Sequence, residues 1–162
     1  MIEHTSKIMV MKIFPGLLLV SVIIVACKKE PVPPPFPPVF SVHGGTTSHN
    51  NGQVCMTCHT AGGPGPNNWI VAGSVFQPDY VTPAVNGTLF FWSQSGGTGD
   101  LIATLQVDGL GNFFTTSSIL PGTDVYPQIQ GAQGDIRNMP IPAPNGNCSS
   151  CHGVTQNPIW VN

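Results

Sequence analysis

The stretch Trp69–Phe76, WIVAGSVF, decides the fold. It is short, apolar and rich in β-branched and aromatic residues, as in a buried strand. Four further runs of this kind, separated by Gly, Pro, Asn and Asp, cover residues 87–92, 101–107, 112–116 and 125–129. No stretch shows a sustained period of 3.6 residues, so helix should be scarce. The sequence therefore predicts a mainly β fold, a small β-sandwich.

The segments on either side of this β-module, which spans residues 67–130, are irregular. Residues 39–66 and 131–162 are rich in Gly, Asn, Ser, Thr and Pro. Each contains one copy of the pattern Cys-x-x-Cys-His: CMTCH at residues 55–59, the first motif, and CSSCH at residues 148–152, the second motif. The short apolar stretch at residues 158–161 is expected to cover a cofactor or an edge of the sandwich.

Cys-x-x-Cys-His is the attachment signature of c-type haem. The two thiols add to the two vinyl groups of one haem, and the adjacent histidine ligates the iron as its proximal ligand. The residues predicted to hold two covalent haem c groups are Cys55, Cys58, His59, Cys148, Cys151 and His152. A four-cysteine zinc site, two redox dithiols or two disulfides would also use the four thiols, but none of them requires both histidines.

Each iron has a sixth position to fill, and three side chains are candidate ligands. His43 and His49 lie in the segment before the first motif and would give bis-His ligation of both haems. Met139 lies nine residues before Cys148 and competes with them, because a thioether ligand raises the potential of a haem. The alternatives are histidines in polar surface loops and a methionine packed in the core. His49 and His43 are the first candidates, because two irons need two such ligands, and the sequence does not decide which residue serves which haem.

The start of the chain has the layout of a secretory signal. Lys12 precedes an apolar run at residues 13–26 that is too short for a comfortable transmembrane helix. The run ends in Ile24-Val25-Ala26-Cys27, which resembles the lipobox of bacterial lipoproteins. The resemblance implies that residues 1–26 are cleaved and that Cys27 becomes a lipidated N-terminus on the periplasmic or cell-surface side of the bacterial envelope. An uncleaved anchor, or an ordinary signal peptide with a chance cysteine, remains the alternative.

Residues 27–38 form a predicted tether between this lipid and a single domain at residues 39–162. Six of the eight residues at 31–38 are proline, which favours a polyproline spacer of roughly 25 Å. Beyond the tether Arg137 is the only Lys or Arg, against five Asp. This balance argues against a nucleic-acid partner. A protein partner is expected to present positive charge or apolar surface.

The β-module resembles transthyretin-like and carboxypeptidase-regulatory-like sandwich domains. The resemblance is carried by Gly-rich turns before strands, at residues 71–75 and 85–89, and by the Asp-x-x-Gly-x-Phe turn at residues 108–113. It implies a module that binds or spaces rather than one that catalyses a reaction.

Together these features predict a lipid-anchored, extracytoplasmic dihaem c-type cytochrome. It would carry electrons by outer-sphere transfer, with redox proteins or other haems as partners, and would not be an enzyme. Two alternatives stay open: a haem enzyme or gas sensor with one open iron position, and a β-sandwich binding module with accessory haems. Binding of carbon monoxide to the reduced protein would favour the first alternative.

Overall fold

The computed structural model describes residues 37–119 and 124–162. They belong to one compact unit, Phe36–Asn162. The predicted signal peptide, the predicted lipidation site at Cys27 and most of the predicted tether lie outside the described residues. Within the described ranges no helix has the length and apolar character needed to cross a bilayer.

The described part of the chain is built from strands, with only two single-turn 3-10 helices. The strands are β1 (Val71–Phe76), β2 (Thr88–Gln94), β3 (Thr98–Gln106), β4 (Asn112–Thr115), β5 (Tyr126–Gln130), β6 (Ile136–Asn138) and β7 (Ile159–Trp160), and the helices are η1 (Cys55–Thr57) and η2 (Cys148–Ser150). The prediction of a mainly β fold is confirmed, and β1 to β5 are the five predicted strands. β6 and β7 were not predicted, because runs of three and two residues carry no periodic signal.

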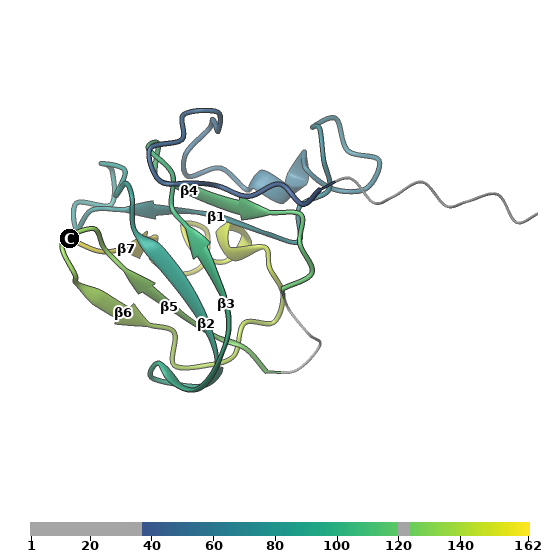
Figure 1. The fold of residues 1–162 in the computed structure, drawn as a ribbon. Helices are drawn as coiled ribbons and strands as arrows, with labels where there is room; N and C mark the ends of the chain where they lie inside the picture. Colours follow the sequence, from purple (N-terminus) through teal and green to yellow (C-terminus); the bar gives the residue numbers. More distant parts are fainter. Residues whose placement is uncertain (1–36, 120–123) are drawn as a thin grey trace, which may run out of the picture. The chain divides into compact units, whose positions relative to one another are not determined.

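The strands form two sheets (Figure 1). One sheet has the order β4-β1-β7, and the other has the order β3-β2-β5-β6. β1 is central in the first sheet, antiparallel to β4 and parallel to β7. The expected turn after β3 is also confirmed: the Asp108 carboxylate accepts hydrogen bonds from the backbone N–H groups of Leu110 and Asn112, at 2.9 and 3.0 Å.

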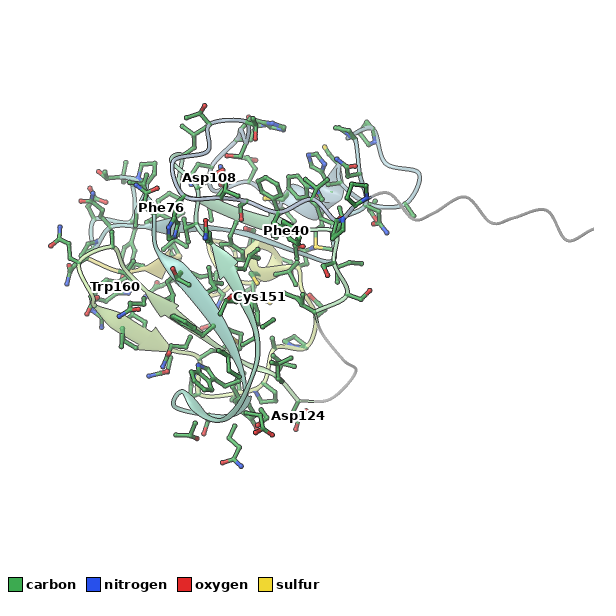
Figure 2. All side chains as sticks on the ribbon, viewed as in Figure 1. Phe40, Phe76, Asp108, Asp124, Cys151 and Trp160 are labelled. Carbon is green, nitrogen blue, oxygen red and sulfur yellow. The ribbon has the colours of Figure 1, made fainter. Side chains whose placement is uncertain are left out.

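The main core is a cluster of buried side chains from both sheets; Figure 2 draws all the described side chains on the ribbon. Val71 and Val75 of β1 meet Leu89 and Phe91 of β2 there, and all four are nearly inaccessible to water. β1 also buries its other face, because Ala72 packs in a second cluster with Trp69 and Phe114. Because β1 is buried on both faces, it is held rigidly, and the segments that pack against it are held in place as well.

Gly73, in the middle of β1, allows two neighbouring segments to approach the strand closely. A Cβ atom at this position would collide with the Phe113 ring and lie 3.0 Å from the Cβ atom of Cys148. A side chain would therefore push the second motif away from the strand.

We expect a Leu105→Ala change to lower the free energy of unfolding by about 2–5 kcal/mol, because Leu105 is buried and its truncation leaves a cavity. Leu101→Ala is the matched control on the same strand; Leu101 is 48% exposed, and its truncation should cost within about 0.5 kcal/mol. Urea unfolding followed by tryptophan fluorescence measures both. Equal losses in the two variants would contradict the placement of the core between the sheets.

Candidate functional site

The two motifs fold into the same turn. In the first motif the N–H of His59 donates to the carbonyl of Cys55 at 3.1 Å, and in the second the N–H of His152 donates to the carbonyl of Cys148 at 3.0 Å. Each turn begins with a single-turn 3-10 helix at the first cysteine. All four cysteines are free thiols. Each motif therefore carries two thiols and one imidazole on the same backbone turn.

Both motif histidines are held through the same ring nitrogen. Nδ1 of His59 lies 2.7 Å from the carbonyl oxygen of Pro66, and Nδ1 of His152 lies 2.9 Å from the carbonyl oxygen of Asn157. Because a carbonyl only accepts, each Nδ1 must carry the hydrogen, and the lone pair of the neutral ring is then on Nε2. This hydrogen bond is the one that orients metal-ligating histidines in proteins.

An aromatic stack fixes the ring of the first histidine. The rings of His59 and Trp69 are parallel within 4°, with centroids 3.6 Å apart, and Trp69 stacks in turn on Phe114 at 4.6 Å. His59 is only 4% exposed. The indole Nε1 of Trp69 is buried without a hydrogen-bond partner among the described residues. An orphaned donor of this kind is satisfied when a polar group binds beside it.

The loop that carries the Pro66 carbonyl passes close beneath the ring. Gly65 donates its N–H to the carbonyl of Cys58 at 3.0 Å. A Cβ atom on Gly65 would lie 2.9 Å from Nδ1 of His59, closer than real side chains approach. Glycine at this position therefore lets the loop fold under the histidine.

The structure brings one of the two other candidate histidines to the first motif. The ring centroid of His49 lies 5.8 Å from that of His59, with a tilt of 40°. His49 is therefore the candidate sixth ligand whose ring lies near the first motif. His43 is engaged elsewhere: its Nε2 lies 2.9 Å from the carbonyl oxygen of Gly87, just before β2.

The segment just before the second motif is hydrogen-bonded to one edge of β1. The N–H of Ala72 donates to the carbonyl of Gly146 at 2.9 Å, and Ala72 forms a parallel bridge with Asn147. The chain then leaves the strand, makes the motif turn and returns as β7, where Ile159 pairs with Val75. The predicted role of residues 158–161 as a cover for the sandwich edge is confirmed. One strand thus holds both ends of the loop that contains the second motif.

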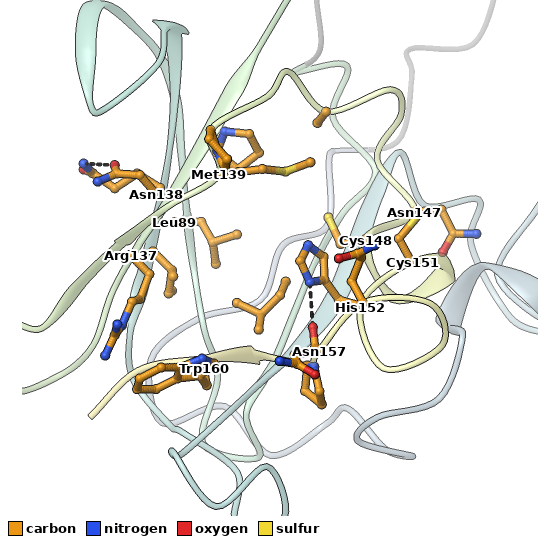
Figure 3. Close-up of a pocket in the computed structure, with 18 of the residues that line it drawn as sticks. Leu89, Arg137, Asn138, Met139, Asn147, Cys148, Cys151, His152, Asn157 and Trp160 are labelled. Atoms are coloured by element: carbon orange, nitrogen blue, oxygen red, sulfur yellow. Dashed lines mark hydrogen bonds between the residues drawn. The ribbon is translucent and has the colours of Figure 1, made fainter.

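A cavity of about 360 Å³, which we call the second-motif cavity, opens beside this loop (Figure 3). Its volume lies within the roughly 300–1,000 Å³ of cofactor pockets. The Met139 side chain and the His152 ring both border it, and its apolar lining includes Leu89, Ile129, Ile159 and Trp160. The structure therefore brings Met139 to the second motif. An apolar cavity with two thiols, one imidazole and one thioether fits a covalently attached haem.

The two motifs are neighbours across β1. Burial raises the pKa of the Cys55 thiol, and its own backbone and the Ser149 side chain of the second motif partly offset this rise. Removal from water raises the pKa of Cys148 to about 12, and the nearby thiols of Cys55 and Cys151 add to the rise. Two cofactors attached to the thiols of the two motifs would therefore be attached close to each other.

No family model, curated protein or solved structure matches the chain significantly.

The groups that support the motif histidines could not be identified from the sequence. The Pro66 and Asn157 carbonyls are backbone groups, and their identity depends on how each loop closes. One signal was available: a tryptophan follows each of these residues by three positions, Trp69 in one case and Trp160 in the other. This repeated spacing marks the two halves as similar beyond the motifs themselves.

In protein produced without haem attachment, the Cys148 thiol is expected to be alkylated about a hundredfold more slowly, or slower still, than the exposed Cys151 thiol at pH 8. The thiolate is the nucleophile. With a pKa of about 12, only roughly one Cys148 thiol in ten thousand is ionised at that pH. Timed iodoacetamide labelling with peptide mass spectrometry measures both rates. Raising the pH should accelerate the labelling of Cys148, and equal rates at pH 8 would contradict its desolvated position.

Proposed function

We propose that the chain is a c-type cytochrome that carries two covalent haems and transfers electrons outside the cytoplasm, anchored by a lipid on Cys27. One observation carries the proposal. Both motifs present a free pair of thiols beside a histidine whose Nδ1 is bound to a backbone carbonyl, which leaves Nε2 for a metal. A four-cysteine zinc site or a pair of dithiols would leave both of these histidines without a role.

When bound, each haem would supply a centre for reversible one-electron transfer. The protein's own groups have separate tasks around it. Cys55, Cys58, Cys148 and Cys151 would hold the macrocycles through thioethers, and His59 and His152 would ligate the irons. The Pro66 and Asn157 carbonyls would fix the imidazole planes and raise their basicity.

For the sixth ligands the geometry favours a different residue in each half. His49 is proposed for the first haem, because its ring is the one near His59. Met139 is proposed for the second haem, because it borders the same cavity as His152. The His43 ring is tied to Gly87, so it is not assigned to either iron. Thioether ligation would give the second haem the higher potential, so the first electron would rest there.

The closeness of the motifs supports electron exchange between the two haems within one molecule, because Cys55 packs against the cluster that contains Ala72, and Ala72 pairs with Asn147 beside the second motif. The proposed partners are redox proteins or the haems of a neighbouring cytochrome. With Arg137 as the only cation beyond the tether and five aspartates, a partner that docks by charge should be basic. A nucleic-acid partner is not proposed.

Intact mass and optical spectra of the full chain, produced in a host with c-haem maturation machinery, test the proposal directly. We expect two haems that remain attached after denaturation, and a sharp α-band on reduction. Cys148→Ser with Cys151→Ser should retain a single haem. A wild-type protein without covalent haem would overturn the proposal and leave the β-sandwich as the functional part.

A Met139→Leu change is expected to open the sixth position of the second haem, because leucine cannot ligate iron. The reduced variant should bind carbon monoxide, whereas the six-coordinate wild-type protein should not. His49→Ala should do the same at the first haem, and His43→Ala is the matched control. Carbon monoxide spectra of the three reduced variants measure the effect. Binding in the His43 variant alone would reverse the ligand assignment, and binding in the wild-type protein would favour an enzyme or sensor.

A further inference from the structure

Arg137 borders the second-motif cavity from β6 (Figure 3). Its guanidinium carbon lies 3.5 Å from the ring centroid of Trp160. Its Nε pairs with the carboxylate of Asp135 at 3.3 Å. The stack and the ion pair fix the plane of the guanidinium, and neither Nη nitrogen has a hydrogen-bond partner among the described residues, so both can donate to another acceptor.

The guanidinium stands across the cavity from the thiols. Figure 3 shows Arg137 on one side and Cys148 and Cys151 on the other, with the His152 ring between them. In a covalent c-type haem the thioethers join the vinyl-bearing edge of the macrocycle, and the two propionates project from the opposite edge. A haem attached at the second motif would therefore extend its carboxylates toward the side on which Arg137 lies.

We propose that Arg137 binds a propionate of the second haem and thereby raises the potential of that haem. The inference rests on the proposed function, because it requires a haem at the second motif. A guanidinium matches a carboxylate with two parallel hydrogen bonds, which a lysine cannot reproduce. Its positive charge disfavours the additional charge of the ferric iron, and an apolar cavity screens that effect less than water does.

Asp135 is the charged group that competes for the guanidinium. Its Oδ2 also accepts the backbone N–H of Asn162 at 3.2 Å, so the carboxylate is shared between two donors. The Arg137 side chain is 43% exposed, and that of Asp135 is 25% exposed. Removing the Asp135 charge should strengthen the field of Arg137 at the cavity, with an effect opposite in sign to the loss of Arg137.

The test is spectroelectrochemical titration of the holoprotein and of three variants at the cavity. Arg137→Gln should shift the reduction equilibrium of the second haem toward the ferric form by a factor of roughly three to ten. Arg137→Lys should shift it less, and Asp135→Asn should shift it toward the ferrous form. The first haem should be unaffected in all three. A Cys55→Ser, Cys58→Ser variant, which keeps only the second haem, assigns the potentials.

Asp100→Asn is the matched control, because Asp100 is an exposed carboxylate on β3, at the opposite edge of the same sheet from β6. An unchanged second-haem potential in Arg137→Gln, or equal shifts of both haems, would overturn the proposal. If Arg137→Gln fails to retain the second haem, Arg137→Lys and Asp135→Asn decide, and no shift in either overturns it. A wild-type chain without covalent haem would instead refute the proposed function.

Discussion

The arrangement of both motifs depends on the burial of β1. Its outer face packs against Trp69 and Phe114, its inner face fills the space between the sheets, and both of its edges are paired. The first motif rests on the outer face, and the second is tied to the edge that β7 also covers. A rigid strand thus converts two irregular, Gly- and Asn-rich segments into fixed positions for thiols and imidazoles.

Local chemistry made the fold class predictable. The five longer strands carry enough β-branched and aromatic residues to be recognised one by one, as WIVAGSVF shows for β1. β6 and β7 could not be recognised, because strands of three and two residues carry no pattern of their own. Arg137 is in a strand through its pairing with Ile129 of β5, and Trp160 through its pairing with Phe76 of β1. The motifs themselves were evident from their spacing. The carbonyl partners of His59 and His152 were not, because a backbone acceptor has no signature in the sequence.

The candidate sixth ligands could likewise be found in the sequence, but only the structure could assign them to a motif. Three side chains had suitable chemistry, and the count of two histidines for two irons placed His49 and His43 ahead of Met139. Tertiary structure separates them: His49 lies near His59, Met139 shares a cavity with His152, and the Nε2 of His43 faces the carbonyl of Gly87. In the sequence Arg137 stood out only as the single Lys or Arg beyond the tether. The structure places this one cation at the second-motif cavity.

The way in which β7 closes β1 also bears on solubility. A strand as apolar as β1 would attract other chains if its hydrogen-bonding edge were open. Charged residues make up only 7% of the chain, so electrostatic repulsion offers little protection against association. The pairing of Ala72 with Asn147 and of Val75 with Ile159 covers that edge with the two ends of the loop that carries the second motif. The C-terminal segment therefore guards the protein against edge-to-edge aggregation, which its surface charge is too sparse to prevent.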